Sequence, residues 1–194
     1  MINSQTDIYT RLAKKDDLPW IINLQRKNLD SAISAHVKES QGFVSIETGI
    51  ELLEEMIDKI GITVAISDKK VIGYLFAITE PIAKKTPIID KFVENIDKYE
   101  YGWKKISSFR YCILWQICIE EKFRWTGVFN ELYKHYFGEL KDAYDIAVWW
   151  VCSDNNRSLH VHKNKLWMEV ISEFKEWGKD WHIVVLDFKK NYTF

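Results

Sequence analysis

The sequence predicts one mixed α/β domain, with a twisted mixed central β-sheet and helices on both faces. Three observations favour this class. The 194 residues suit one compact core, the 47% of apolar residues exclude disorder, and strand-like and helical periodicities alternate along the chain. Repeats, linkers and low-complexity stretches are missing from the sequence, so residues 1–194 are expected to form a single domain.

The first third of the chain predicts a short strand followed by two helices. Residues 8–12 alternate apolar with polar side chains, as a half-buried strand does. Asp16 or Asp17 then offers an N-cap to a helix. Thr48 and Glu51 have the spacing of a capping box for the next helix. The apolar stripes of the two helices comprise Trp20, Ile21, Leu24 and Leu29, and then Leu52, Leu53, Met56, Ile57 and Ile60.

A hairpin and a helical insertion are predicted next. Strand-like runs at residues 62–67 and 71–79 are separated by a short polar turn. Residues 80–108 insert between the third and fourth strands, where Thr86 is a plausible N-cap and Pro87 suits the first helical position. The insertion is therefore expected to carry a helix.

Three aromatic residues of the insertion, Tyr99, Tyr101 and Trp103, lie in a polar setting. They could face a substrate, or the segment could be an ordinary helical connection between two strands. The sequence favours the second interpretation.

The second half of the chain alternates strand and helix. The expected elements are a strand at 109–119, a helix from Thr126, a strand at 146–152, a helix at 155–165 and closing strands at 170–174 and 181–188. Gly178 marks the turn between the last two strands.

Composition excludes several classes of function. A net charge of −1 and only scattered lysine pairs argue against a nucleic-acid-binding protein. No apolar run approaches a membrane span, and the N-terminus lacks the pattern of a signal peptide. Cys112, Cys118 and Cys152 lie in apolar runs without a CxxC pair, so a reduced, cytoplasmic location is expected. His160 and His162, two apart on a helix, cannot share a metal ion, and no metal site is expected.

The most informative motif lies where the expected strand at 109–119 ends. Arg124 follows the strand, and Gly127 opens the next helix. A strand that leads into a helix N-terminus gathers unpaired backbone N–H groups and the positive end of the helix dipole, which suits an anion. A second window at such a junction carries Asn155, Ser158 and His162.

These two windows resemble the GNAT superfamily, whose members transfer an acyl group from coenzyme A to an amine. Arg124 to Phe129 occupies the place of the pyrophosphate loop Arg/Gln-x-x-Gly-x-Gly/Ala. Asn155, Ser158 and His162 match the later pattern Asn-x-x-Ser/Ala-x-x-x-Tyr/His. The resemblance covers most of the chain and is weakest before residue 60 and in the insertion.

The loop departs from the family pattern at two positions. Trp125 stands where the family usually has glycine, and Phe129 where it has glycine or alanine. The Phe129 side chain is therefore expected to turn into the core rather than toward the cofactor. Trp125 is expected to lie over the loop, against the adenine or at the surface.

The resemblance implies acetyl-CoA as co-substrate, and an acetyl group that passes to a primary amine by direct attack in a ternary complex. In the family the strand matching 117–119 separates from that matching 146–152, so that its backbone pairs with the pantetheine arm. The residues implied in acetyl-CoA binding are Ile117, Cys118, Ile119, Arg124, Trp125, Thr126, Gly127, Val128, Phe129, Asn155 and Ser158. His162 falls on the position of the acid that protonates the departing thiolate.

The acceptor is expected to be a small-molecule amine or a peptide amine. Gln116, with Tyr99, Tyr101 and Trp103, is the candidate for the acceptor side. No residue stands out as general base. The alternatives are a GNAT-like module that binds acyl-CoA without catalysis and a protein-interaction domain, and the surplus of aromatic residues is compatible with a homodimer.

Overall fold

The computed structural model describes residues 7–190 and 192. The start of the chain, on which the expectation of no signal peptide rests, lies largely outside these residues. The strands are β1 (Tyr9–Leu12), β2 (Ile62–Ser67), β3 (Lys70–Ile78), β4 (Glu100–Tyr101), β5 (Lys104–Lys105), β6 (Tyr111–Ile119), β7 (Ile146–Cys152), β8 (Glu169–Glu176) and β9 (Lys179–Asp187). The α-helices are α1 (Leu18–Asn28), α2 (Ala35–Gln41), α3 (Ile50–Lys59), α4 (Glu80–Ala83), α5 (Pro87–Val93), α6 (Val128–Leu140) and α7 (Asn156–Asn164).

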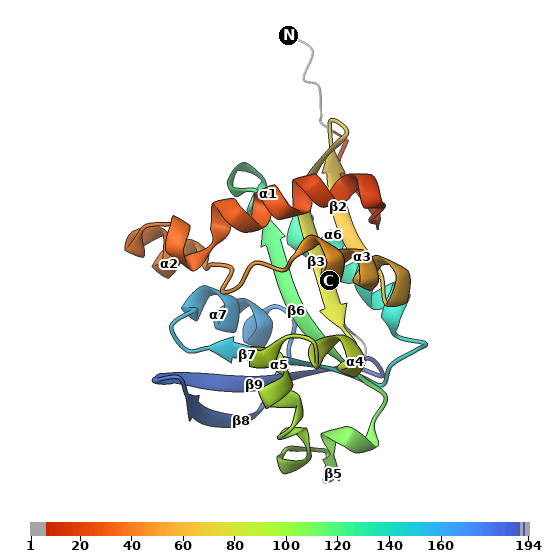
Figure 1. Cartoon of the computed structure of the whole chain (residues 1–194), viewed down its shortest axis with the longest axis vertical. Helices are drawn as coiled ribbons and strands as arrows, with labels where there is room; N and C mark the ends of the chain where they lie inside the picture. The colour runs from red at the N-terminus through yellow and green to blue at the C-terminus, as the bar shows by residue number, and fades with distance from the viewer. Residues whose placement is uncertain (1–6, 191, 193–194) are drawn as a thin grey trace.

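Seven of these strands form one mixed sheet in the order β1-β2-β3-β6-β7-β9-β8. Within it β6 and β7 run parallel, and the other neighbours run antiparallel. Figure 1 shows β3 and β6 running steeply while β7, β8 and β9 lie across them, so the sheet is strongly twisted. The predicted mixed sheet is confirmed.

The centre of the sheet splits between β6 and β7. Parallel pairing is confined to the start of both strands and ends at Ile113 and Val148. On its other side β6 stays paired with β3, but Phe76 faces Gln116 and Ala77 faces Leu114, which leaves Trp115 as an extra residue. Such a bulge bends the strand and increases its twist. The bulge therefore accompanies the separation of β6 from β7.

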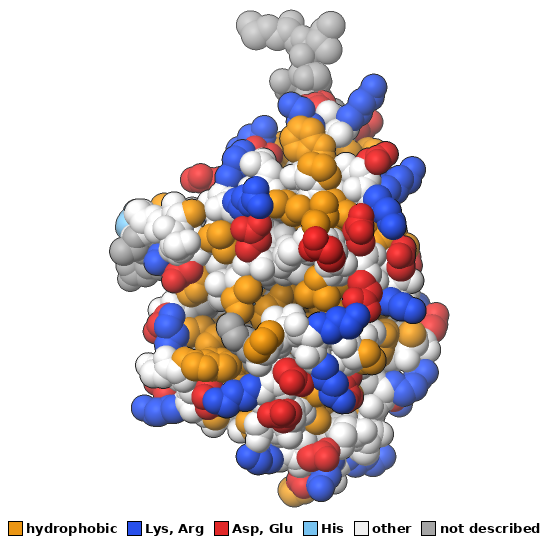
Figure 2. Space-filling model, in the orientation of Figure 1, with side chains coloured by type: hydrophobic (Ala, Val, Ile, Leu, Met, Phe, Trp, Pro, Cys, Tyr) orange, Lys and Arg blue, Asp and Glu red, His pale blue; other side chains and the backbone are white. Residues whose placement is uncertain are grey.

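Helices cover both faces of the sheet, as predicted. The first hydrophobic cluster packs apolar side chains of α1, α3, α4 and α5 against one face. The second packs α6 and the segment that follows α7 against the other face. No helix in the described part of the chain is long and apolar enough to cross a membrane. On the face drawn in Figure 2, acidic and basic side chains are interspersed around a central group of hydrophobic ones.

Two local expectations need correction. The Thr48–Glu51 capping box does not form, because Gly49 is the N-cap of α3 and Thr48 is buried against the sheet. The insertion carries more than the expected helix, because α4, α5 and the hairpin of β4 and β5 all form within it. Trp103 lies in the hairpin turn with a positive φ of 66° and is 96% exposed.

Candidate functional site

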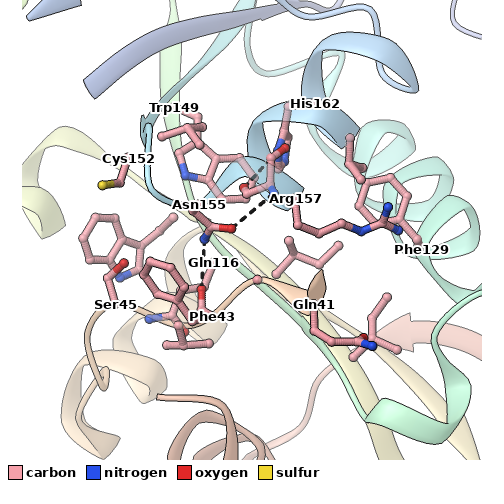
Figure 3. Close-up of a pocket in the computed structure, with 18 of the residues that line it drawn as sticks. Gln41, Phe43, Ser45, Gln116, Phe129, Trp149, Cys152, Asn155, Arg157 and His162 are labelled. Atoms are coloured by element: carbon pink, nitrogen blue, oxygen red, sulfur yellow. Dashed lines mark hydrogen bonds between the residues drawn. The ribbon is translucent and has the colours of Figure 1, made fainter. Parts of the chain in front are cut away.

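A cavity of about 440 Å³ opens where β6 and β7 separate. This volume falls in the range of small-molecule and cofactor sites. Strands β6 and β7 form its floor, the N-terminal turn of α6 and helix α7 form one wall, and residues 41–46 cover it. In Figure 3, Arg157 and Phe129 lie on one side of Asn155, and Cys152 and Ser45 lie on the other. The cavity thus has two ends with different chemistry.

The end next to α6 presents unpaired backbone donors. The backbone N–H groups from Trp125 to Asn130 have no acceptor among the described residues. Gly127 is the N-cap of α6 with a φ of 90°, and a Cβ added there would meet open space. Trp125 also has a positive φ, of 72°. A left-handed turn that leads into a helix N-terminus with free N–H donors is an arrangement that suits an anion.

Positive side chains surround the same end. Arg157 lies 3.9 Å from the centre of the Trp125 ring, and Lys165 Nζ lies 5.7 Å from it. Burial lowers the pKa of Arg157, and the nearby charge of Arg124 lowers it further. Among the residues that the structure describes, these three cations form no ion pair with a carboxylate. Unpaired positive charge in a half-buried position favours a polyanionic ligand.

Arg124 is held by the protein rather than left free to contact a phosphate directly. Its Nε donates to the carbonyl oxygen of Ile119, and its two terminal nitrogens donate to Gln41 Oε1 and Asn28 Oδ1, at 2.6–3.0 Å. The side chain thus joins the end of β6 to α1 and α2. It contributes its charge to the anion site and fixes the start of the loop.

Asn155 ties the cover to the opposite wall. Its Oδ1 accepts from the N–H of Ser158, which caps α7, and its Nδ2 donates to the carbonyl oxygen of Phe43 at 3.3 Å. Asn155 is buried, and its Oδ1 would lie 3.0 Å from a Cβ added at Gly42. The close approach explains the glycine at position 42, and Asn155 positions the cover rather than contacting a ligand with a free amide.

The surroundings of His162 argue against the acid role expected for it. Its ring borders the cavity, but the residue is only 1% exposed, and burial lowers its pKa to about 4. Nδ1 lies 2.6 Å from the carbonyl oxygen of Ser158, so it must carry the proton and donate. Nε2 then accepts from the Tyr133 hydroxyl at 2.8 Å. A neutral ring with its only proton already engaged does not act as the acid at neutral pH.

Gln116 lines the cavity, but its amide serves the fold. Oε1 accepts from the hydroxyl of Tyr74 at 2.9 Å. Nε2 donates to the carbonyl oxygen of Ile46 and to Thr48 Oγ1, which also accepts from Trp115 Nε1. This buried network fastens the cover to β6. It also explains why Thr48 does not cap α3.

The end of the cavity near Cys152 is aromatic. Phe92 of α5 stacks on Trp150 of β7, with ring centres 4.9 Å apart, and meets Trp181 of β9 at 5.7 Å. These three rings and Trp115 line the cavity. The pKa of the Cys152 thiol is raised by burial. Sequence reasoning missed these residues, because an aromatic stripe that lines a cavity has the same periodicity as one in a core.

The structure gathers most of the predicted site residues around the cavity and leaves others outside. Those that line it are Gln116, Ile117, Ile119, Arg124, Trp125, Gly127, Phe129, Asn155, Ser158 and His162. Cys118 points to the other face of the sheet, toward Leu24. Val128 is buried, and Thr126 donates to the carbonyl oxygen of Phe123. The backbone N–H groups of Thr126 and Val128 still belong to the run of free N–H groups from Trp125 to Asn130.

The side chains of Phe129 and Trp125 can be compared with the positions expected for them. Phe129 is half-buried against Tyr133, with ring centres 4.8 Å apart, but it also borders the cavity. Its aromatic face therefore forms part of the wall instead of lying wholly in the core. Trp125 is 69% exposed and lies beneath the Arg157 guanidinium.

The three aromatic residues of the insertion do not line the cavity. Tyr101 donates to Asp187 Oδ2 at 3.0 Å, and Tyr99 packs near Phe174. Trp103 lies at the exposed hairpin turn. Tyr99 and Tyr101 connect the insertion to β8 and β9, and among the described residues of the insertion Phe92 reaches the cavity. In the described part of the chain, no group of three or more His, Cys, Asp or Glu could hold a metal ion.

Comparison with solved structures shows that the chain has the fold of the GNAT N-acetyltransferases. The ribosomal-protein-S18-alanine N-acetyltransferase of Escherichia coli superposes with a TM-score of 0.62 at 9% identity, covering 95% of this chain and 96% of that one. An N-acetyltransferase of Staphylococcus aureus gives a TM-score of 0.60 at 17% identity, with 95% and 100% covered. The Salmonella typhimurium protein yncA, determined with its cofactor acetyl-CoA, gives 0.60 at 13% identity, with 96% of both chains covered.

Comparisons of sequence are less informative. No family model matches the chain. The E3 ubiquitin-protein ligase SINA-like 3 of Arabidopsis thaliana is 32% identical over 78 residues, which are 40% of this chain. The match spans 23% of the length of that curated relative.

Proposed function

We propose that the chain is an N-acetyltransferase that moves an acetyl group from acetyl-CoA to an amine in a ternary complex. The observation that carries the proposal is the anion site at the split of the sheet. A run of backbone N–H groups from Trp125 to Asn130 and three unpaired cations meet there. The diphosphate of coenzyme A is a ligand with matching charge and size.

The split itself suits the rest of the cofactor. Beyond Ile113 no residue of β6 pairs with β7 in the described part of the chain, although β6 stays paired with β3. Its free edge can hydrogen-bond an extended pantetheine arm as an added strand would. The thioester would then lie between the anion site and the aromatic end. A backbone N–H of this edge is the candidate donor to the oxyanion of the tetrahedral intermediate.

Calorimetry with acetyl-CoA tests the proposal. We expect binding that weakens with added salt, because phosphate contacts are partly electrostatic. Arg157→Gln should weaken it about tenfold or more, since a charge-assisted hydrogen bond is worth about 1.5–3 kcal/mol. Lys163→Gln is the matched control, because Lys163 lies exposed on the same helix and does not line the cavity.

Release of free thiol in the presence of amines then separates an enzyme from a binding module. An enzyme releases coenzyme A only with a suitable acceptor. A chain that binds acetyl-CoA without any release would be a binding module. A chain that does not bind acetyl-CoA at all would refute the proposal.

A further inference from the structure

The walls of the aromatic end carry no negative charge. None of the described residues that line the cavity is an aspartate or a glutamate. The charged side chains of the lining are Arg124, Arg157 and Lys165, which are all positive and lie at the other end, next to α6. An alkylammonium acceptor would therefore enter a cavity whose described lining offers it no acidic counter-ion. A neutral acceptor meets no such barrier.

Among the described residues that line the cavity, none is free to remove a proton from an ammonium ion. Its remaining titratable residues are Cys152 and His162, because α5, β6 and β9 contribute no titratable side chain to the lining. Both ring nitrogens of His162 are engaged, and the Cys152 thiol stays protonated near neutral pH because burial raises its pKa. An alkylammonium with a pKa near that of lysine, about 10.4, is neutral in roughly one molecule in a few thousand at pH 7.

A neutral amine needs no such base. Its nitrogen lone pair attacks the thioester carbonyl carbon, and the C–N bond forms while the C=O π electrons move to oxygen. The adduct collapses, the C–S bond breaks with its electron pair on sulfur, and the N–H proton passes to that sulfur directly or through water. Amine and acetyl-CoA give the amide and free coenzyme A without net release of a proton. With an ammonium ion as acceptor, the reaction releases one additional proton, and a base must accept it.

The shape of this end favours a flat apolar body. Phe92, Trp115, Trp150 and Trp181 line it, and the ring of Phe92 contacts those of both Trp150 and Trp181. Aromatic side chains pack well against another ring by stacking or edge-to-face contact. An aromatic amine is also weakly basic, because its lone pair is delocalised into the ring, so it arrives neutral.

We propose that the acyl acceptor is a weakly basic aromatic amine, bound neutral among Phe92, Trp150 and Trp181. This inference rests on the proposed function and names the substrate class of the same site. Two isomers of identical composition separate the alternatives: 4-methylaniline, which is neutral at pH 7, and benzylamine, which is an ammonium ion. A short peptide with a free alanine N-terminus is the third acceptor.

The expected result is a kcat/KM for 4-methylaniline about 100-fold above that for benzylamine at pH 7. The rate with 4-methylaniline should stay flat between about pH 6 and 8, whereas that with benzylamine should rise about tenfold per unit. If kcat/KM for benzylamine or for the peptide equalled that for 4-methylaniline, this inference would be overturned and the proposed function would still stand. Failure to bind acetyl-CoA in calorimetry would overturn both.

A pair of tryptophans supplies the matched variants. Trp181 and Trp177 both contact Phe92, at 5.7 and 5.3 Å between ring centres, but only Trp181 is among the residues that line the cavity. Trp181→Leu should raise the KM for 4-methylaniline about tenfold and leave acetyl-CoA affinity unchanged. Trp177→Leu should leave both unchanged. Equal KM values for Trp181→Leu and the wild type would contradict the assignment of this end to the acceptor.

Discussion

Replacing Gly127 by valine is expected to weaken acetyl-CoA binding about a hundredfold while the protein stays folded. Gly127 has a φ of 90°, which costs a residue with a side chain about 1–2 kcal/mol. The added Cβ would clash with nothing, because no heavy atom lies within 4 Å of it. It would instead occupy the open region in front of the N–H groups of α6.

The size of the effect follows from the hydrogen bonds at stake. A relaxed φ at residue 127 would turn the neighbouring N–H groups away from their common focus. Loss of two hydrogen bonds to a charged phosphate, at about 1.5 kcal/mol each, amounts to roughly a hundredfold in affinity. Calorimetry with acetyl-CoA on the folded variant measures it directly.

Gly178 provides the control for strain. It lies in the turn between β8 and β9 with a φ of 70°, and a Cβ there would also meet open space. Gly178→Val should therefore lose a similar free energy of unfolding, about 1–2 kcal/mol, without loss of acetyl-CoA affinity. Two variants that bind acetyl-CoA equally well would remove the reason for placing the phosphates at Gly127.

The second half of the fold was predictable because its signals are local. Strand β7 has the predicted bounds, and Asn155 caps α7 through the N–H of Ser158, as the spacing of the two residues indicates. Gly127 opens α6 within two residues of the expected start. A continuous apolar run, a capping side chain and a glycine each act within one turn of chain, so sequence alone contains them.

The cover of the cavity was not predictable because its contacts are long-range. The cover, residues 41–46, belongs to the segment 29–48, which forms short helices and a loop without a strong apolar stripe. Arg124 and Asn155 hold this segment from more than eighty residues away in the chain. Thr48 fits a local capping pattern, but its hydroxyl accepts a buried hydrogen bond from Gln116 instead of capping α3. Leaving the buried amide of Gln116 unpaired would cost more free energy than the loss of the cap.

For His162 the sequence predicts the position of the ring but not its protonation state. The spacing from Asn155 placed the ring at the cavity correctly. Burial lowers its pKa, and the spacing of residues does not reveal that burial or the contact with the hydroxyl of Tyr133, twenty-nine residues away. Burial therefore favours a neutral His162 ring that positions the wall, and the acid role stays a prediction.

The contribution of His162 to the stability of the protein should consequently fall by about 3 kcal/mol as the pH drops from 7 to 4. The His162 pKa is about 4 in the folded protein and about 6.5 in the unfolded chain. Between these values the unfolded state binds a proton that the folded state does not, so acid favours unfolding. The contribution is fully present above about pH 6.5 and is lost as the pH falls through 4. Each pKa unit corresponds to about 1.4 kcal/mol.

Urea unfolding at a series of pH values measures this slope. His162→Gln should lower stability at pH 7 and flatten the dependence between about pH 4.5 and 6.5, because glutamine does not titrate. His160→Gln is the control on the same helix, where residue 160 is exposed, and it should keep the slope of the wild type. Asp145 does not confound the window, because its pKa in the unfolded chain is about 3.9, and the stabilisation that Arg110 gives it is lost mainly below that pH. A wild-type slope that survives His162→Gln would show that this histidine is not buried in its neutral form, and would restore it as a candidate acid for the departing thiolate.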